Sequence, residues 1–403
     1  MTKLKNILIL AGGDGSRFWP LKRKSYFPFL GKPLLLYLIE NIDQYAEKII
    51  VVVNSADVQL IDTLNLNSKI TAVEQNSSSA GQAGAIISAK NKLKGEVLVL
   101  NAEDLFNFEI LRQYIDILKS SRPEIILLAK KVDKYFSGGY FNLEKNRVKE
   151  IIEKPKPEQT PSNLVRLVVD YFKDFSLLVN AIVKTKTNRD DQYEQAINAL
   201  IYKTGPADYI TYTDFWYPLK YSWQVLPMLS YFLKSLNKDE IRLGKNVKIA
   251  ATAKFVGPCF IDDDTVIGDF TLIRQSQIGK NCLIGGHSEV TRSYLGDNVY
   301  LHRNYVGDSV LAENIMFGAQ AATANFRFDA KSIASKLAGK KIDSNLVKFG
   351  AVVGEGSKIG VNATLLPGVK IGKNTFVGPG EIIYEDIKDN IFVLQGKQTK
   401  NLV

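Results

Sequence analysis

Residues 351–378 read AVVGEGSKIGVNATLLPGVKIGKNTFVG, and this stretch decides the fold of the second half of the chain. Within it an aliphatic residue precedes a glycine four times, in the pairs that begin at Val353, Ile359, Ile371 and Val377. Successive pairs are six, twelve and six residues apart. A period of six with an aliphatic residue at each repeat predicts a parallel β-helix of triangular section, in which these side chains stack inward.

The same pair recurs earlier with looser spacing, at Ile267-Gly268, Ile278-Gly279, Ile284-Gly285, Leu295-Gly296 and Val306-Gly307. Helical periodicity is weak beyond Ile241, so we expect the coil to occupy a domain of residues 239–403. Residues 329–347 lack the repeat and are predicted to leave the coil as a loop or a short helix.

The first half of the chain has a different sequence pattern, in which short runs of β-branched residues alternate with segments of helical periodicity. The expected strands are residues 7–10, 48–53, 96–100 and 125–128, and the expected helices between them include residues 34–45 and 84–91. This alternation predicts an α/β domain over residues 1–238, with a mainly parallel sheet flanked by helices.

Composition narrows the class of protein. With 23% charged and 45% hydrophobic residues, the chain has the composition of an ordinary globular protein. The basic residues behind its net charge of +10 are scattered along the sequence, which indicates a solvated surface that also attracts phosphorylated substrates. A nucleic-acid partner is not expected, because no basic patch interleaved with aromatic residues and no reading motif is present. No stretch is long enough to span a membrane. Cys259 and Cys282 lack metal-ligand spacing and suit a reducing compartment, so we expect a cytoplasmic protein.

Two groups of polar residues follow expected strands. A glycine-rich loop, Gly12, Gly13 and Gly15 with Ser16 and Arg17, comes directly after the first strand. The exposed backbone N–H groups of such a loop, together with an arginine side chain, are suited to binding a phosphate. Glu103-Asp104 follows the strand at residues 96–100. In parallel sheets ligands bind beyond the carboxyl ends of the strands, where both groups are expected to lie.

Several longer motifs carry a resemblance to a known family. In the first half they are GGDGSRFWPL, Glu74-Gln75 followed by Gly81-Gln82-Ala83, Glu103-Asp104, and IIEKP at residues 151–155. In the second half residues 301–331 read LHRNYVGDSVLAENIMFGAQAATANFRFDAK. In this order the motifs resemble the bifunctional sugar-1-phosphate nucleotidyltransferase/acetyltransferases, including archaeal relatives of this length. The resemblance implies a Rossmann-like nucleotidyltransferase domain, a left-handed β-helix with acyltransferase character, and a homotrimer.

For the first domain the resemblance implies a site for a nucleotide or a nucleotide-sugar. Its nucleotide contacts would be Gly12, Gly13, Gly15, Ser16, Arg17, Gln75, Gly81, Glu153 and Lys154. Asp104 would hold the Mg²⁺ that bridges the phosphates during nucleotidyl transfer.

The chain departs from that family at four places in the first domain, one of which is Ala80-Gly81-Gln82-Ala83 in place of a base-binding Leu-Gly-Thr-Ala string. Phe27-Pro28-Phe29 stands where a lysine is expected, Pro218 replaces a second metal carboxylate, and Arg166-Leu167-Val168 replaces a sugar-binding Asn-Ala-Gly. Losing one transition-state charge alone costs ~10²–10³ in rate. We therefore expect weakened or absent nucleotidyl transfer, unless Asp214 or Glu153 supplies the carboxylate and a neighbouring lysine the cation.

For the second domain the resemblance implies acetyl transfer from acetyl-CoA to an amino-sugar phosphate, with His302 as the base. Contacts to the sugar phosphate and to acetyl-CoA would come from Arg274, Tyr305, Gly318, Ala319, Asn325 and Lys331. Here too there are departures, since Thr291 replaces a lysine, with Arg292 as a possible substitute, and Met316 replaces an asparagine. His287, the other histidine, is expected to be a surface residue of the coil.

Three hypotheses follow. The first is an acetyltransferase with a weakened nucleotidyltransferase domain. The second is a fully bifunctional enzyme of the UDP-N-acetylglucosamine or GDP-mannose type, and the third is a non-catalytic regulatory protein that binds a sugar nucleotide. The sequence alone identifies neither the sugar nor the nucleotide.

Overall fold

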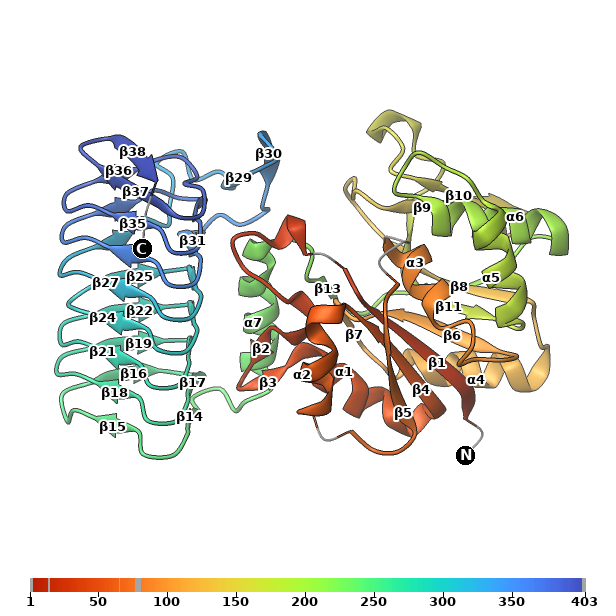
Figure 1. Ribbon diagram of the computed structural model, residues 1–403, viewed down its shortest axis with the longest axis horizontal. Helices are drawn as coiled ribbons and strands as arrows, with labels where there is room; N and C mark the ends of the chain where they lie inside the picture. Colours follow the sequence, from red (N-terminus) through yellow and green to blue (C-terminus); the bar gives the residue numbers. More distant parts are fainter. Residues whose placement is uncertain (1–2, 14, 65, 77–80, 401–403) are drawn as a thin grey trace. The chain divides into compact units, whose positions relative to one another are not determined.

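The computed structural model describes residues 3–13, 15–64, 66–76 and 81–400, and its contacts divide the chain into two compact units (Figure 1). The first unit comprises residues 1–14 and 35–216, and the second comprises residues 15–34 and 217–403. The domain limits expected from the sequence, 1–238 and 239–403, stay a prediction, because the contact units describe packing and not domain boundaries. In the contacts, residues 15–34 and 217–238 go with the second unit.

The first unit is built on a nine-stranded sheet with the strand order β10-β9-β11-β6-β1-β4-β5, in which β8 pairs with β11 and β12. Its strands are β1 (Leu4–Ala11), β4 (Ala46–Val53), β5 (Ile70–Glu74), β6 (Val97–Asn101), β8 (Ile125–Lys131), β9 (Gly139–Glu144), β10 (Arg147–Glu153), β11 (Leu164–Phe172) and β12 (Asp208–Tyr212). The helices are α1 (Leu34–Ile42), α2 (Val58–Asp62), α3 (Gly81–Ser88), α4 (Ile110–Ser120), α5 (Phe175–Lys184) and α6 (Gln192–Thr204). Short strands β7 (Asp104–Phe106) and β13 (Trp216–Pro218) follow β6 and β12 in the chain.

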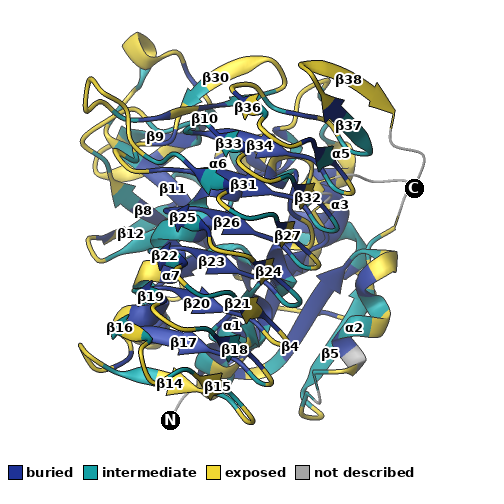
Figure 2. Ribbon diagram, turned by 90° about the vertical axis from the view of Figure 1, so that its left-hand side faces the viewer, coloured by how far each residue is buried: buried dark blue, intermediate teal, exposed yellow. Residues whose placement is uncertain are grey.

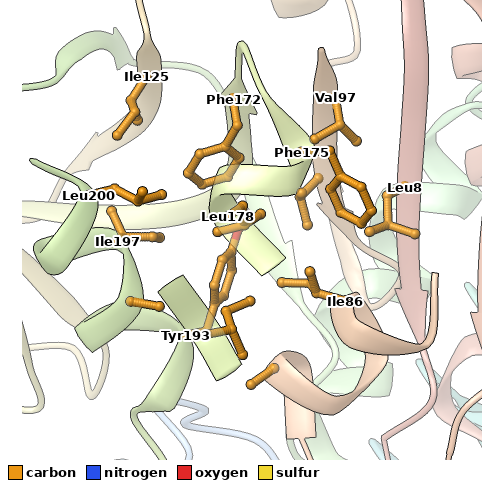
Figure 3. Packing of buried hydrophobic residues seen from close by; sticks show 14 of the residues in the cluster. Leu8, Ile86, Val97, Ile125, Phe172, Phe175, Leu178, Tyr193, Ile197 and Leu200 are labelled. Atoms are coloured by element: carbon orange, nitrogen blue, oxygen red, sulfur yellow. The ribbon is translucent and has the colours of Figure 1, made fainter. Parts of the chain in front are cut away.

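The sheet is parallel over β6, β1, β4 and β5, as the alternation predicts. It is mixed elsewhere, because β11 runs antiparallel to β6, β8 and β9. The apolar run of β11 gives no sign of its direction. Residues Leu8, Val97, Phe172 and Phe175 lie in the core between this sheet and helices α3, α5 and α6 (Figure 3).

The second unit contains a β-helix whose three sheets, parallel except for the final strand at residues 397–400, form the faces of a triangular coil, as the six-residue period predicts. The first sheet holds β14 (Ile241–Leu243), β17 (Cys259–Ile261), β20 (Gln277–Ile278), β23 (Tyr294–Leu295), β26 (Val310–Leu311), β31 (Ala351–Val353) and β34 (Val369–Ile371). The second holds β15 (Lys248–Ile249), β18 (Val266–Ile267), β21 (Leu283–Ile284), β24 (Tyr300–Leu301), β27 (Met316–Phe317), β32 (Lys358–Ile359), β35 (Phe376–Val377), β37 (Ile391–Leu394) and β38 (Lys397–Lys400). The third holds β16 (Lys254–Val256), β19 (Leu272–Arg274), β22 (Glu289–Thr291), β25 (Tyr305–Gly307), β28 (Ala322–Thr323), β33 (Thr364–Leu365) and β36 (Ile382–Ile383).

The aliphatic residues of the repeat are buried inside the coil, and the corners between the sheets are more exposed (Figure 2). The free cysteines Cys259 and Cys282 are buried in this core, where burial raises the pKa of Cys282 to about 12. The coil is interrupted after β28, and the excursion is a hairpin of β29 (Ala334–Leu337) and β30 (Lys340–Asp343). A loop or short helix was expected there. Among the described residues no helix is both long and apolar enough to cross a membrane.

Residues 15–34, which we call the strap, lie along the outer face of the first coil sheet. The Trp19 indole N–H donates to Asp389 Oδ1 at 2.8 Å, and Lys22 pairs with Glu355 at 2.7 Å. Farther along, the backbone N–H of Leu30 donates to Gln277 Oε1 at 2.8 Å. The strap therefore contacts the β-helix from β20, the third strand of the first sheet, to Asp389 near the carboxyl end of the coil.

Aromatic rings fill the middle of this contact. Phe27 lies 4.6 Å from the ring of Tyr294 on β23, and Phe29 stacks at 4.8 Å on Phe232 of α7 (Val225–Lys234). All four rings are buried. The Phe27-Pro28-Phe29 run therefore takes part in packing the strap on the coil.

Replacing Phe27 by alanine is expected to destabilise the second unit by ~3 kcal/mol or more, because a buried ring leaves a cavity. Phe270, whose ring is 61% exposed, is the matched control, and its replacement by alanine should change stability little. Denaturant unfolding of both variants measures the difference. Equal shifts of the two midpoints would contradict the packing role of Phe27.

Candidate functional sites

The proposed base, His302, lies at a corner of the coil between the second and third sheets, directly after β24. Its side chain is exposed, and its backbone N–H donates to the side-chain oxygen of Asn304. Three residues later Tyr305 begins β25. The turn places the imidazole outside the coil, where a dissolved substrate can reach it.

A connected polar cluster follows this corner on the third sheet. Asn325 Nδ2 donates to Tyr305 Oη at 3.1 Å and also to Asp308 Oδ2. Asp308 in turn accepts two hydrogen bonds from the guanidinium of Arg292, at 2.6 and 2.7 Å. Two predicted site residues, Tyr305 and Asn325, are therefore in direct contact.

The electrostatics of this cluster are set by burial and by the ion pair. Burial raises the pKa of the Tyr305 phenol, whose oxygen accepts the hydrogen bond from Asn325. The hydrogen bonds to Asp308 raise the pKa of Arg292. Arg292 stands beside Thr291, where a lysine was expected, and the structure brings its charge into the same network as Tyr305.

The other predicted residues of this site lie around the cluster without a shared network. Arg274 ends β19, two coils before Tyr305, and pairs in register with Thr291 on the coil between them. Gly318 and Ala319 form a turn after β27, and the Gly318 carbonyl accepts from Asn304 at 2.7 Å. Lys331 is exposed at the start of the excursion, where its backbone N–H donates to Asp329.

The first unit gathers several predicted nucleotide contacts at the carboxyl edge of its parallel strands. β1 and β6 are neighbours, so the loop after Ala11 and the residues after Asn101 lie at one edge. Gln75 packs directly on Gly12, since a Cβ there would lie 1.9 Å from Gln75 Oε1. Gln75 Nε2 also donates to the Gly81 carbonyl at 3.2 Å.

Gly13 lies at the same edge, and its carbonyl accepts from Asn54 at 3.0 Å. Gly15, Ser16 and Arg17 belong to the strap of the second unit, where Gly15 has a φ of 70° that favours glycine and the side chains of Ser16 and Arg17 are exposed. Residue 14 lies outside the described part of the chain.

Asp104, the predicted metal ligand, accepts hydrogen bonds through both of its carboxylate oxygens. One oxygen accepts from Asn101 Nδ2 at 3.0 Å, and the other accepts from the Trp216 indole at 3.0 Å. Asp214 is bound to Asn107 at 2.7 Å. No group of three or more histidine, cysteine or acidic side chains with metal-ligand spacing occurs in the described part of the chain.

This donor set fits Mg²⁺ only in part. Mg²⁺ is usually held by one or two carboxylates together with substrate phosphates, and Asp104 provides one. Pro218 occupies the expected position of the second. We therefore derive no reaction step through a metal at this edge.

Glu153 and Lys154 lie at the end of β10, and Lys154 Nζ pairs with Glu153 at 3.0 Å. Burial and the nearby carboxylate of Glu194 raise the pKa of Glu153. The side chain of Glu153 also lies close to Gly139, where a Cβ would be 3.0 Å from Glu153 Oε2.

Arg166 on β11 occupies the first position of the expected Asn-Ala-Gly segment, and it is enclosed in a buried ion network. Its guanidinium pairs with Asp170 at 2.7 Å and with Glu194 at 2.7 Å. The ring of Tyr193 lies 4.6 Å from the guanidinium carbon, and its hydroxyl donates to Asp170 at 2.9 Å. A wholly buried cation has thus replaced the small residues expected there.

Sequence reasoning did not identify Asn304 or Asp308 as functional candidates. Each acts by hydrogen bonds between successive coils, which a local motif does not reveal. One signal was available for Asn304. The corner that contains it advances five positions, from Tyr300 to Tyr305, whereas the corresponding corner one coil earlier advances six positions, from Leu283 to Glu289.

Family models match both units. The nucleotidyl transferase model matches residues 6–219, the hexapeptide model of bacterial transferases matches residues 350–380, and a hexapeptide model of succinyl-transferases matches residues 277–302. The chain is therefore a transferase that combines a nucleotidyltransferase fold with a left-handed β-helix.

Relatives match over nearly the whole length. The bifunctional protein GlmU of Methanococcus maripaludis strain C5 is 30% identical over 413 residues, covering 96% of each chain. The bifunctional sugar-1-phosphate nucleotidylyltransferase/acetyltransferase of Sulfurisphaera tokodaii is 30% identical over 412 residues, covering 94% of this chain and 97% of the relative. The chain belongs to this family of archaeal GlmU-like bifunctional proteins.

A solved structure supports the fold of the first unit. The apo form of a UDP-glucose pyrophosphorylase superposes with a TM-score of 0.51 at 19% identity, over 58% of this chain and 100% of the other. At this identity the likeness concerns the fold alone.

Proposed function

We propose that the β-helix transfers the acetyl group of acetyl-CoA to the amine of an amino-sugar 1-phosphate. The observation that carries the proposal is the contact between Tyr305 and Asn325, which is joined through Asp308 to Arg292 and lies three residues beyond His302. A hydroxyl, an amide and a guanidinium together suit a phosphorylated sugar. The family membership supports the reaction type.

In the proposed reaction the substrate amine attacks the thioester carbonyl while His302 accepts a proton from the nitrogen. A carbon–nitrogen bond forms, and collapse of the tetrahedral intermediate breaks the carbon–sulfur bond and releases CoA. Gly318 and Ala319 would contact the acyl donor through their backbone. Arg274 and Lys331 would attract the phosphate, with Arg292 in support.

We also propose that nucleotidyl transfer by the first unit is weakened. The buried Arg166 network fills a position that should hold small sugar-binding residues, and Pro218 stands where the second metal carboxylate beside Asp104 is expected. In addition Lys22, a possible substitute for the missing lysine, is paired with Glu355. The closeness of Gly12 to Gln75 supports retained nucleotide binding.

Full bifunctionality is the second candidate. It is favoured by the whole-length match to relatives named as bifunctional and by the retained polar edge around Asp104. For either candidate we propose a cytoplasmic homotrimer, on the basis of the family resemblance.

Two assays on the wild-type protein test these proposals. Thiol release from acetyl-CoA is expected with glucosamine 1-phosphate or galactosamine 1-phosphate, and much less with unphosphorylated glucosamine. Release with none of these sugars would overturn the acetyltransferase proposal. Pyrophosphate release from UTP or GTP with a sugar 1-phosphate and Mg²⁺ should be ~100-fold slower or more, for want of transition-state charge. Comparable rates in the two assays would establish the bifunctional alternative.

A further inference from the structure

We infer that Asn304 is a positioning residue for acetyl transfer, which holds the His302 backbone and the Gly318–Ala321 turn in fixed relation. This inference rests on the proposed function of the β-helix. It concerns a side chain that is only 3% exposed and therefore acts through its neighbours.

The side chain of Asn304 makes three hydrogen bonds, which involve two successive coils. Its oxygen accepts from the backbone N–H of His302 in the same coil. Its nitrogen donates to the carbonyls of Gly318 at 2.7 Å and Ala321 at 2.9 Å in the next coil. One amide group thus links the corner of the proposed base to the turn of the proposed acyl-donor contacts.

The shortened corner explains why an amide is needed there. Six residues separate Met316 from Ala322 on the next coil, but five separate Tyr300 from Tyr305. In regular coils the backbone N–H and C=O groups of successive corners hydrogen-bond to each other. Because the corner of residues 300–305 is one residue shorter than the next, some of these groups need another partner. Asn304 supplies both a donor and an acceptor at this place, and its own N–H donates to Ser288 Oγ at 3.0 Å.

The geometry matters for the reaction because base and acyl donor must approach the same amine. A misplacement of about 1 Å in a reacting group costs ~10²-fold in rate. His302 and the Gly318–Ala321 turn belong to successive coils, and Asn304 contacts both. Loss of its side chain would let the two move independently.

The test compares Asn304→Ser, Asn304→Asp and the control Ser288→Ala. Serine is too short to keep either set of bonds, whereas aspartate retains the acceptor for the His302 N–H and loses both donors. Ser288 lies one coil earlier, and Ser288→Ala removes the buried hydrogen bond from the Asn304 backbone N–H without removing a contact to His302 or to the turn. Thermal unfolding of each variant is measured beside its kinetics.

We expect Asn304→Ser to lower kcat by ~10- to 100-fold, through loss of alignment. Asn304→Asp should weaken CoA binding several-fold in calorimetric titration and recover part of the kcat lost in the serine variant. Ser288→Ala should keep kcat and CoA affinity. If all three variants lose activity in proportion to their loss of unfolding temperature, or if Asn304→Ser keeps both kcat and CoA affinity, the inference is overturned.

The experiment distinguishes failure of the proposed function from failure of the inference about Asn304. A wild-type protein that acetylates none of the tested amino sugars overturns the proposed function. The CoA titration still decides the role of Asn304, because CoA binding needs no sugar acceptor. Weaker CoA binding by Asn304→Asp with unchanged binding by Ser288→Ala supports the inference, and equal binding by both contradicts it.

Discussion

Replacing His302 by alanine is expected to lower kcat for acetyl transfer by ~10²–10⁴-fold, because the attacking amine loses its proton acceptor. The imidazole lies outside the coil, so its removal should leave the fold and CoA binding intact. Thiol release gives kcat, and calorimetry gives the affinity for CoA. A large loss of kcat with unchanged CoA affinity identifies a chemical role rather than a structural one.

The chain provides its own control in the other histidine. His287 is exposed at the corresponding corner one coil earlier, where its ring stacks on Phe270 at 5.1 Å. Replacing it by alanine should leave kcat unchanged. Similar losses in both variants, or full activity of His302→Ala, would show that His302 is not the base.

Removing the carboxylate of Asp170 is expected to destabilise the first unit by ~3–5 kcal/mol, since it breaks a buried ion pair with Arg166 and removes the acceptor of the buried Tyr193 hydroxyl. Asp170 is fully buried and accepts from both Arg166 and Tyr193. In Asp170→Ala the guanidinium of Arg166 would keep Glu194 as its remaining anion. Tyr193 also packs in the core with Phe172, so the loss extends beyond the ion pair (Figure 3).

An exposed ion pair of the same unit is the matched comparison. Asp208 pairs with Arg147 at 2.8 Å, and their side chains are 40% and 47% exposed. Asp208→Ala should cost at most about 1 kcal/mol, because water solvates both charges. Denaturant unfolding measures both variants, and equal losses would refute a structural role for the Arg166 network.

Much of the architecture could be predicted from the sequence because the hydrophobic patterns are periodic. The inward residues Ile359, Ile371 and Val377 are buried and pair between coils as the six-residue period requires. The strands at residues 7–10 and 96–100 also form as expected and lie side by side.

The packing of the strap could not be predicted, because it depends on contacts between distant residues. Phe27 contacts Tyr294, although more than half of the chain separates them in sequence. The sequence around either residue gives no sign of the other. A glycine loop is normally assigned to the domain of the strand before it. Here the residues after position 14 belong by contact to the coil unit.

The candidate acetyl-transfer site was predicted to the extent that it lies within one continuous motif. His302, Tyr305 and Asn325 were identified in this way, and Tyr305 contacts Asn325. Asn304 and Asp308 were missed because their hydrogen bonds join successive coils. The short corner from Tyr300 to Tyr305 is the feature that would have singled out Asn304.

The central claim is acetyl transfer by the β-helix, and the initial rate of CoA release with glucosamine 1-phosphate tests it most directly. The account predicts saturable release by the wild-type protein, with N-acetylglucosamine 1-phosphate as the product, and a loss of this activity in His302→Ala. Absence of N-acetylated product with both glucosamine 1-phosphate and galactosamine 1-phosphate, from a folded protein that binds CoA, would contradict it.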